Sequence, residues 1–270
     1  MTAVQSLPVA RRRTSRPRVA RVARPVVAVA VLIGAQEALT RTDVLPAGYF
    51  PPASEIVRTF VGELGDDSLG PALMSTVRTW LLALLVSVGL GTAVGVLLGL
   101  VRPLEAFLRP VIEFMRPVPS VALIPLVVLT IGTGSGAALF LACFAAFWQV
   151  LVPVITGVRS APAIALDTAR SYSLSTWQRI RWIQLPSMLP HLATATRLAA
   201  STTLILIVTA EIIIQMPGIG HEITMSRSAG DPARMYAYIA LSGAAGIVLN
   251  VLVRRIEKRL NASHGLEGSR

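Results

Sequence analysis

The residues from Thr79 to Val101 read TWLLALLVSVGLGTAVGVLLGLV, a run of 23 residues without a charged side chain. A helix needs about 20 predominantly apolar residues to cross about 30 Å of bilayer hydrocarbon. Arg78 precedes the run and Arg102 follows it, so charged residues mark both of its ends. The run therefore predicts a membrane-spanning helix and places the chain among integral membrane proteins.

Four more spans are predicted by the same measure. Between Arg116 and Arg159 lie 42 uncharged residues, interrupted by Gly132-Thr133-Gly134-Ser135-Gly136. Because a glycine-rich break of this kind forms a turn, the region reads as a hairpin of two spans. The four predicted spans are 111–131, 137–157, 198–216 and 235–253.

The sixth predicted span, 25–40, is shorter and contains Glu37. It follows a basic segment, which makes it the natural first span. The predicted fold class is an all-α integral membrane domain with six transmembrane helices. A cleavable signal peptide is the alternative interpretation of the N-terminus, since a basic region before a short apolar core is also typical of such peptides.

Charge is scarce in this chain. There are 25 Lys plus Arg against 14 Asp plus Glu, giving a net charge of +11, yet only 14% of the residues are charged. A soluble domain has about 25% charged residues. A nucleic-acid-binding protein would carry its basic charge on a polar exterior rather than beside long apolar runs. The composition argues against both classes.

The charge between the predicted spans alternates along the chain. The positive segments are 1–25 with +7, 102–116 with +1, 159–197 with +4 and 254–270 with +3. The others are 41–76 with −3, 132–136 with 0 and 217–234 with 0. Because positively charged loops tend to remain in the cytoplasm, we expect both termini and both basic loops on the cytoplasmic side of the membrane.

These boundaries predict four parts of the chain. They are a basic cytoplasmic N-terminal tail (1–24), a first span with an outer interfacial segment (25–76), the transmembrane domain (77–257) and a cytoplasmic C-terminal tail (258–270). In the outer segment, Ser54 is expected to cap a helix that reaches Leu64 and presents one apolar face. This helix is expected to lie on the outer membrane interface.

The cytoplasmic loop 159–197 is too long for a simple hairpin connection. Ser160 and Pro162 predict the start of a short helix that ends near Tyr172. Ser175 and Gln178 then form a capping box, which predicts a second short helix.

Pro186 is expected to end that second helix. Two short helices that meet at a sharp corner would project as a compact knob with exposed apolar residues. Arg170, Arg179 and Arg181 would surround them. A surface of this composition is suited to docking another protein.

The same loop carries a family pattern. Asp167-Thr168-Ala169, then Ser173, then Ile183-Gln184-Leu185-Pro186 resembles the EAA loop of ABC importer permeases, which has Glu-Ala-Ala, Gly and Ile-x-Leu-Pro at this spacing. Asp167 and Thr168 depart from the pattern, although Asp keeps the carboxylate. Ser173 stands in place of the Gly that supplies a positive-φ corner, so a different corner or less efficient coupling is expected.

Other stretches resemble the permeases for nitrate, sulfonate and taurine within this family. They are Arg116-Pro117-Val118-Pro119 with Ala122-Leu123-Ile124-Pro125-Leu126 and Gly132-Thr133-Gly134, Thr209-Ala210-Glu211 with Pro217-Gly218-Ile219-Gly220, and Arg254-Arg255-Ile256-Glu257-Lys258-Arg259. The resemblance covers about residues 50–260.

The resemblance implies the transmembrane permease of a type I (MetI-like) ABC importer. A small solute, such as the anions sulfonate, taurine or nitrate, would come from an extracytoplasmic binding protein and cross by alternating access. Two permease copies, forming a homodimer, would each dock on a separate ATPase subunit that uses ATP and Mg²⁺, and this chain would hold no cofactor. The implied ATPase-coupling residues are Asp167, Thr168, Ala169, Arg170, Ser173, Arg179, Ile183, Leu185 and Pro186.

The chain is not expected to be an enzyme. A P-loop requires Gly-Lys-Ser/Thr, whereas the single lysine, Lys258, stands between Glu257 and Arg259. His191, His221 and His264 lack the spacing of metal ligands. ATP hydrolysis must therefore come from a separate subunit.

Polar side chains inside the predicted spans are candidates for the translocation pathway: Glu211, Thr202, Thr203 and Gln149. Glu211 is either a pathway or gating residue, or a hydrogen-bonded packing residue near the outer membrane boundary. The hydroxyl groups either line the pathway or bond back to helix carbonyls. Gly91, Gly95 and Gly99 allow close helix approach, either within one subunit or at a dimer seam.

Two other classes of function are open at this point. An ion-coupled secondary transporter or channel-like protein without an ATPase would be favoured by inverted repeats with broken midplane helices, and none is visible. A structural membrane subunit without a transport role is the third possibility.

Overall fold

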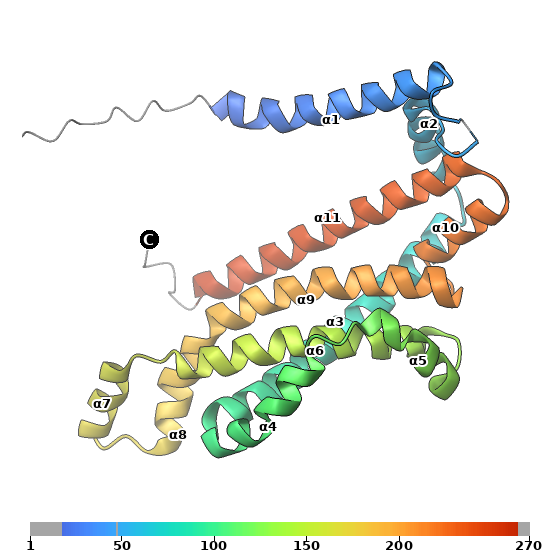
Figure 1. Ribbon diagram of the computed structural model, residues 1–270. Coiled ribbons are helices and arrows are strands. Elements are labelled where there is room, and N and C mark those ends of the chain that lie inside the picture. Colours follow the sequence, from blue (N-terminus) through green and yellow to red (C-terminus); the bar gives the residue numbers. More distant parts are fainter. Residues whose placement is uncertain (1–17, 47, 264–270) are drawn as a thin grey trace, which may run out of the picture. The chain divides into compact units, whose positions relative to one another are not determined.

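In the computed structural model, the structure describes residues 18–46 and 48–263, and the chain divides into two compact units, 1–56 and 57–270. All regular secondary structure in the described residues is helical (Figure 1). Most of the predicted tail 1–24 lies outside the described residues, as do the last seven residues of the predicted tail 258–270.

The first unit contains α1 (Arg18–Arg41) and the beginning of α2 (Ala53–Glu63). Glu37, near the end of α1, accepts hydrogen bonds from the Ser54 backbone N–H at 3.0 Å and from the Ser54 hydroxyl at 2.9 Å. Ser54 is therefore not the N-cap that the sequence predicts. The helix begins at Ala53, so Ser54 lies in its first turn, and Glu37 supplies the negative charge that a helix N-terminus favours.

The second unit holds the remaining helices. They are α3 (Leu69–Leu100), α4 (Arg102–Met115), the 3-10 turn η1 (Ser120–Leu123), α5 (Ile124–Ile131), α6 (Ser135–Arg159), α7 (Ala163–Ser171), α8 (Thr176–Arg179), the π turn η2 (Ile180–Gln184), α9 (Leu185–Ile214), α10 (Ile219–Ser228) and α11 (Pro232–Ser263). Within this unit, α7 and α8 lie at one end of the long helices, here named the knob end. Helices α5 and α10 lie at the opposite end, named the loop end (Figure 1).

Helix α6 forms the centre of the core, with α3 and α9 packed against it. The glycine stripe of α3 faces a stripe of fully buried valines on α6. A Cβ atom added at Gly95 would lie 2.7 Å from Val154 Cγ1, and equivalent close contacts join Gly91 to Val150 and Gly99 to Val158. The glycines therefore allow two helices of the same subunit to approach closely, which confirms the first of the two interpretations.

Four helical segments are long and apolar enough to cross a membrane: Leu69–Leu100, Ser135–Arg159, Thr176–Ser228 and Pro232–Arg255. A fifth is obtained if α4 and the η1–α5 segment, which are bent by 81°, count as one broken span. The predicted first span, carried by α1, is not among these segments of the described chain. The structure thus shows an all-helical membrane fold with four or five candidate spans.

The prediction of one continuous helix over 111–131 is wrong. α4 ends at Met115, and the backbone is extended at Pro119 before η1 begins. Pro117 and Pro119 explain the break, because neither residue has an N–H to donate to a helical hydrogen bond. The predicted loop 102–116 is instead mostly the helix α4.

The connection between α2 and α3 is fixed to the start of α11. The Glu63 carboxylate lies 3.0 Å from the Arg234 guanidinium, and the Tyr238 hydroxyl lies 3.2 Å from the Ser68 hydroxyl. The Ser68 N–H donates to Asp66 at 2.9 Å and lowers the pKa of that carboxyl below its ordinary value. These contacts give the loop end a defined structure.

Candidate functional site

The predicted two-helix knob, residues 160–184, is present at the knob end. α7 follows Pro162, and α8 begins with the predicted capping box. The Gln178 N–H donates to the Ser175 hydroxyl at 3.3 Å, and the Ser175 N–H donates to the Gln178 side-chain oxygen at 2.8 Å. Two backbone donors that a helix start leaves free are thereby satisfied.

Ser173 forms the corner of the knob in a left-handed conformation, with φ of 56°. Its N–H donates to the Arg170 carbonyl at 2.9 Å, and the Leu174 N–H donates to the Ala169 carbonyl at 2.9 Å. A non-glycine residue in this region costs about 1–2 kcal/mol. The positive-φ corner that the EAA pattern builds with glycine is therefore kept here at a conformational cost.

Pro186 does not end the second helix, contrary to the prediction. The Leu185 N–H donates to the Ile180 carbonyl five residues earlier, which defines the π turn η2. Pro186 lies just after this π turn, inside the uninterrupted helical segment, and has no N–H to donate. Because the wider π turn accommodates the proline, α8, η2 and α9 form one continuous helix from Thr176 to Ile214.

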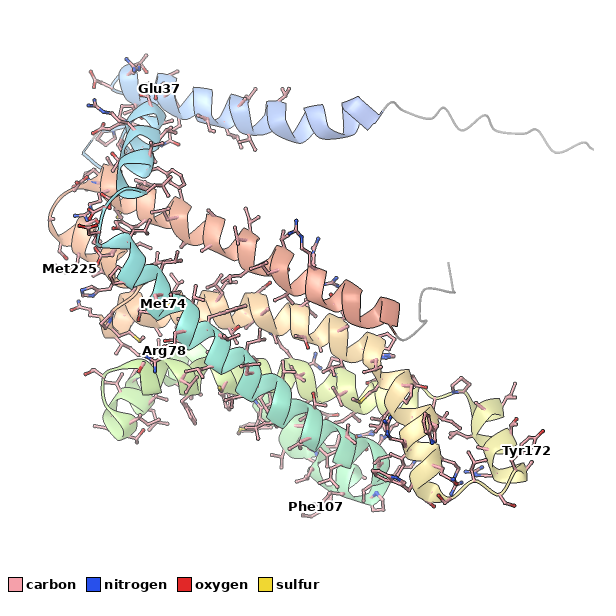
Figure 2. All side chains as sticks on the ribbon, turned by 180° about the vertical axis from the view of Figure 1, so that it is seen from behind. Glu37, Met74, Arg78, Phe107, Tyr172 and Met225 are labelled. Atoms are coloured by element: carbon pink, nitrogen blue, oxygen red, sulfur yellow. The ribbon has the colours of Figure 1, made fainter. Side chains whose placement is uncertain are left out.

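The knob exposes large apolar side chains. Ile164 is 82% exposed, Tyr172 78%, Trp177 69% and Trp182 67%, and Figure 2 shows Tyr172 at the end of the bundle. The Arg181 guanidinium lies 5.3 Å from the centre of the Trp182 ring. An apolar patch rimmed by charge is typical of a protein-docking surface.

All nine predicted coupling residues lie in the knob or where it joins α9. Asp167 and Arg170 form an exposed ion pair at 2.8 Å, and Arg179 donates to the Thr176 hydroxyl at 3.0 Å. Thr168 and Ser173 are exposed and Ala169 is buried, whereas Ile183, Leu185 and Pro186 are half-buried. The structure brings these residues together, and their contact with an ATPase remains a prediction.

Glu211 lies at the loop end and is completely buried. Its carboxyl group accepts hydrogen bonds from the Thr76 hydroxyl at 2.8 Å and from the Gly220 N–H at 2.8 Å. The Thr76 oxygen in turn accepts from the Ile219 N–H at 3.0 Å. These four residues, named the Glu211 cluster, tie α3 and α9 to the start of α10. The described residues contain no salt bridge to Glu211.

The glycines of the Pro217–Gly220 loop make room for Glu211. A Cβ atom at Gly220 would lie 2.7 Å from the Glu211 Cβ and 2.5 Å from the Val208 carbonyl oxygen, and one at Gly218 would overlap the Glu211 carboxyl group. The Ser75 hydroxyl also donates to the Pro217 carbonyl at 2.7 Å. The loop is therefore clamped between α3 and α9 by side chains from both.

The other predicted pathway residues lie between α6 and α9. The side chains of Gln149 and Thr202 bond to each other, with contacts of 2.9 and 3.1 Å, and both are half-buried. Thr203 is fully buried, and its hydroxyl donates to the Ala199 carbonyl at 2.8 Å. Thr203 thus has the helix-bonding role that was the alternative to lining a pathway.

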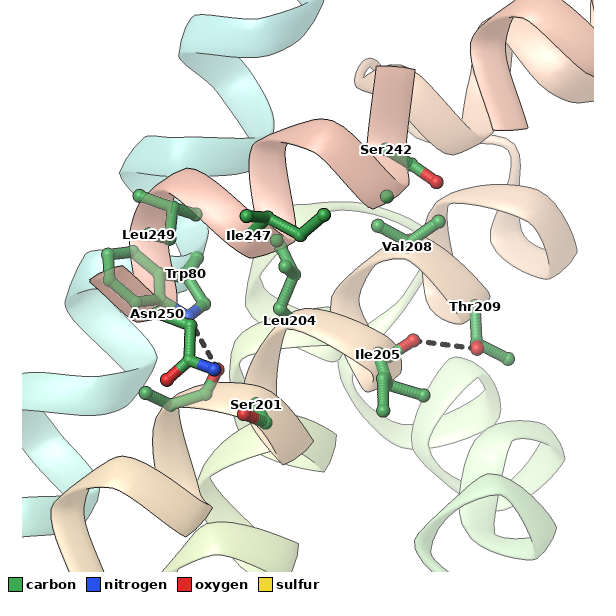
Figure 3. Close-up of a pocket in the computed structure, with 13 residues that line it drawn as sticks. Trp80, Ser201, Leu204, Ile205, Val208, Thr209, Ser242, Ile247, Leu249 and Asn250 are labelled. Carbon is green, nitrogen blue, oxygen red and sulfur yellow. Dashed lines mark hydrogen bonds between the residues drawn. The ribbon is translucent and has the colours of Figure 1, made fainter. Parts of the chain in front are cut away.

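A cavity of about 470 Å³ opens between α3, α9 and α11 (Figure 3). Trp80, Leu204 and Ile247 are among its mainly apolar lining residues, and the Thr209 hydroxyl at its wall bonds to the Ile205 carbonyl. The Trp80 ring N–H donates to the Ala200 carbonyl at 2.8 Å. None of the four predicted pathway residues lines this cavity.

Sequence reasoning missed a charged cluster at the knob end. Arg159 donates to the Leu98 and Gly99 carbonyls at the end of α3 and to Glu105 of α4 at 3.2 Å. Glu105 also pairs with Arg109 at 3.0 Å. A cation at a helix C-terminus satisfies carbonyls that the helix leaves free. Glu105 and Arg109 were spaced i, i+4, a signal of pairing, but the link to Arg159 depends on tertiary packing.

Long apolar helices with an exposed, charge-rimmed knob at one end are the arrangement of a multi-pass membrane protein. Residues 87–262 match the family of binding-protein-dependent transport system inner membrane components. The chain belongs to this family.

Curated relatives agree with this assignment. The taurine transport system permease TauC of Escherichia coli (strain K12) is 28% identical over 245 residues, covering 88% of each chain. The putative aliphatic sulfonates transport permease SsuC of Bacillus subtilis (strain 168) is 26% identical, covering 86% of this chain and 84% of that one. The nitrate import permease NrtB of Leptolyngbya laminosa is 27% identical over 170 residues, covering 63% and 61%.

Solved structures agree on the fold. A chain of the methionine ABC transporter MetNI, in an inward-facing conformation, superposes with a TM-score of 0.59 at 20% identity, covering 73% of this chain and 96% of that chain. An amino acid ABC transporter gives a TM-score of 0.52 at 16% identity. The fold is therefore the all-helical membrane fold of ABC transporter permeases, as the resemblance implied, whereas the six predicted spans are not confirmed.

The family assignment decides among the three hypotheses. This protein is the non-catalytic, multi-pass inner-membrane permease of a binding-protein-dependent ABC importer. A system of this kind includes an ATPase and a solute-binding protein as partners.

Proposed function

We propose that this permease imports a small anion, such as a sulfonate, taurine or nitrate. We also propose that the ATPase drives this import by contacting the knob. The observation that carries the coupling is the continuous helix from Thr176 to Ile214. It begins in the exposed knob, and its last turn contains Glu211. A helix rises about 1.5 Å per residue, so this one connects the knob to Glu211 through about 50 Å of helix length without a loop.

In this proposal the knob end faces the cytoplasm and the loop end faces outward. Six spans, with α1 as the first, place both termini in the cytoplasm. The charge pattern supports this orientation, because the segment 159–197 is net +4 and the segment 217–234 is neutral. The ATPase then reaches the knob directly, and the binding protein delivers its solute to the loop end.

The knob supplies the contact with the ATPase. Asp167, Thr168, Arg170 and Ser173 are exposed beside Tyr172 and Trp177, so they are available to a partner groove. Ala169, Arg179, Ile183, Leu185 and Pro186 hold the two knob helices in position. Approach of two ATPase subunits would turn the knobs of a homodimer, and the continuous helices would carry that movement to the loop end.

The transported solute is proposed from the relatives and from the polar side chains within the helices. TauC, SsuC and NrtB are named for taurine, aliphatic sulfonates and nitrate, all of which carry an oxyanion. Gln149 and Thr202 form a half-buried polar pair that can line a pathway between two copies. Thr203 and Glu211 belong to α9, the helix that carries Thr202, and their hydrogen bonds would hold it in place. The Glu211 cluster would act as the outer gate.

The test is reconstitution of the permease with its ATPase and binding protein in proteoliposomes. We expect ATP-dependent uptake of at least one of taurine, ethanesulfonate, nitrate and bicarbonate. Asp167→Lys should abolish uptake and reduce ATPase co-purification, because it reverses charge on the docking surface. Asp67→Lys, an exposed reversal at the loop end, should leave co-purification unchanged. Uptake that persists fully in the Asp167→Lys variant would contradict the coupling proposal.

A further inference from the structure

We propose that Arg78 forms a binding site for an organic sulfonate in a cavity between α3 and the first turn of α6. This inference rests on the proposed function and adds the place where the anion first contacts the permease, together with its chemical class. The cavity lies at the loop end and measures about 470 Å³. Its lining residues include Met74, Arg78, Leu82, Ser135, Gly136 and Leu139.

Arg78 is the only charged residue that lines the cavity. No carboxylate in the described part of the chain forms a salt bridge with it. In the sequence, Arg78 directly precedes an uncharged apolar run. Helix α3 begins nine residues earlier, at Leu69, so Arg78 lies well inside this helix. The Arg78 side chain is exposed, so its guanidinium is available to an anion that enters the cavity.

The opposite wall of the cavity supplies further donors. The backbone N–H groups of Ser135 and Gly136 have no acceptor within the described residues, because the first bond at the start of α6 is donated by Ala137. With the guanidinium they form a donor set for an oxyanion, since Arg presents several N–H groups in a planar fork. The Ser75 and Thr79 hydroxyls donate to protein carbonyls, so they are not counted as donors to the anion.

The rest of the cavity indicates which anion fits. Met74, Leu82 and Leu139 give it apolar walls, which can pack against an organic group attached to the anion. A sulfonate with a short alkyl chain would place its charged oxygens at Arg78 and its chain against these side chains. Taurine carries an ammonium group that would meet no carboxylate in the cavity. We therefore infer a preference for alkanesulfonates over taurine, nitrate and bicarbonate.

The cavity is also joined to the Glu211 cluster. Ser75, which lines the cavity, donates to the Pro217 carbonyl at 2.7 Å, and the next residue, Thr76, donates to Glu211. Met74 and Arg78 lie one turn apart on the same helix (Figure 2). An anion bound at Arg78 would thus lie beside the segment that holds the proposed outer gate.

The test measures binding of radiolabelled ethanesulfonate to the purified permease–ATPase complex in nanodiscs. We expect saturable binding that taurine, nitrate and bicarbonate compete for at least tenfold less well. Arg78→Gln should weaken binding at least tenfold, and Arg78→Lys should weaken it less. Arg227→Gln, which removes an exposed arginine from α10, is the matched control and should leave binding unchanged. Met74→Trp should reduce binding of butanesulfonate more than that of methanesulfonate, because it narrows the apolar part of the cavity.

Several outcomes would overturn the inference. One is the absence of saturable ethanesulfonate binding, and another is equal binding by the wild type and the Arg78→Gln variant. A third is that Arg78→Gln abolishes stimulation by the binding protein while ethanesulfonate binding persists, which would make Arg78 a protein contact. ATP-dependent uptake is measured separately, so the proposed importer function can stand when this site fails.

Discussion

The Thr76 hydroxyl donates a 2.8 Å hydrogen bond to the Glu211 carboxyl group, joining two helices that are 135 residues apart in the sequence. The same oxygen accepts the Ile219 N–H, so one hydroxyl connects α3, α9 and the start of α10. The bond is fully buried, where an unsatisfied polar group costs about 1–3 kcal/mol. The loop end therefore depends on a small set of polar contacts that can be removed individually.

Thr76→Val and Glu211→Gln should each lower stability by about 1–3 kcal/mol. Valine keeps the shape of threonine but leaves the Ile219 N–H and one Glu211 oxygen without a partner. Glutamine places an N–H₂ group where an oxygen accepts either the Thr76 hydroxyl or the Gly220 N–H. Because both residues belong to one network, the double variant should lose less than the sum of the two. Thermal unfolding of the purified protein measures all three.

Glu222→Gln on α10 is the control for this cycle, since no side-chain hydrogen bond to Glu222 is formed within the described residues. Thr76→Ser keeps the hydroxyl and should retain most of the stability. Strict additivity of Thr76→Val and Glu211→Gln would show that the two side chains do not act together.

Gly220→Ala should destabilise the protein by about 1–3 kcal/mol, because the added methyl group overlaps tightly packed atoms. Those atoms are the Val208 carbonyl oxygen and the Glu211 Cβ. Uptake should fall with stability, since the loop would move away from Glu211. Gly243→Ala provides the comparison, because nothing lies within 4 Å of a Cβ atom there. Equal melting temperatures for the two variants would contradict the packing described at Gly220.

Ser173→Gly should stabilise the knob by up to about 1 kcal/mol, since glycine adopts the left-handed conformation without the Cβ penalty. Hydrogen exchange of the amides at 172–175 should slow, which mass spectrometry can follow. The matched variant Ser171→Gly, at the last residue of α7, should have the opposite effect, because it removes the hydroxyl that donates to the Asp167 carbonyl at 3.1 Å. Faster exchange in the Ser173→Gly variant would be incompatible with the observed corner.

Gly95→Ala should destabilise the core by about 1–3 kcal/mol, because its methyl group would lie against Val154. Combining it with Val154→Ala should recover part of the loss, as the smaller residue on α6 makes room. Gly89→Ala, on the same helix with open space around its Cβ position, should be neutral or slightly stabilising. Melting temperatures in detergent would compare the four variants, and a failure of Val154→Ala to compensate would argue against the α3–α6 contact.

The sequence predicted the features that depend on local patterns. The capping box at Ser175 and Gln178, the knob helices and the glycine stripe all arise from residues a few positions apart, and the structure confirms them. The break between α4 and α5 was missed because apolar composition outweighed the signal from Pro117 and Pro119. The continuity through Pro186 was missed because proline ends many helices, whereas here the preceding π turn accommodates it.

Tertiary relationships were beyond pattern reasoning. Glu211 could be recognised as a buried charge, but its partners Thr76 and Gly220 come from other elements. Arg159 was counted only as loop charge, although it binds the end of α3. Arg78 was assigned to a membrane boundary because uncharged runs were measured from one charged residue to the next. In each case the side chain's role depends on a helix that is distant in the sequence.

The π turn at Ile180–Gln184 determines how the knob is rotated about the helix axis relative to Glu211 at the loop end. A π turn is equivalent to one extra residue within an α-helix, and each residue turns a helix by about 100°. Deleting one residue from this turn would restore ordinary α-helical bonding and rotate the knob by about that angle relative to Glu211. The knob would then present a different face while every transmembrane contact of α9 stayed intact. The proposed coupling should thus be sensitive to residue number as well as to residue identity.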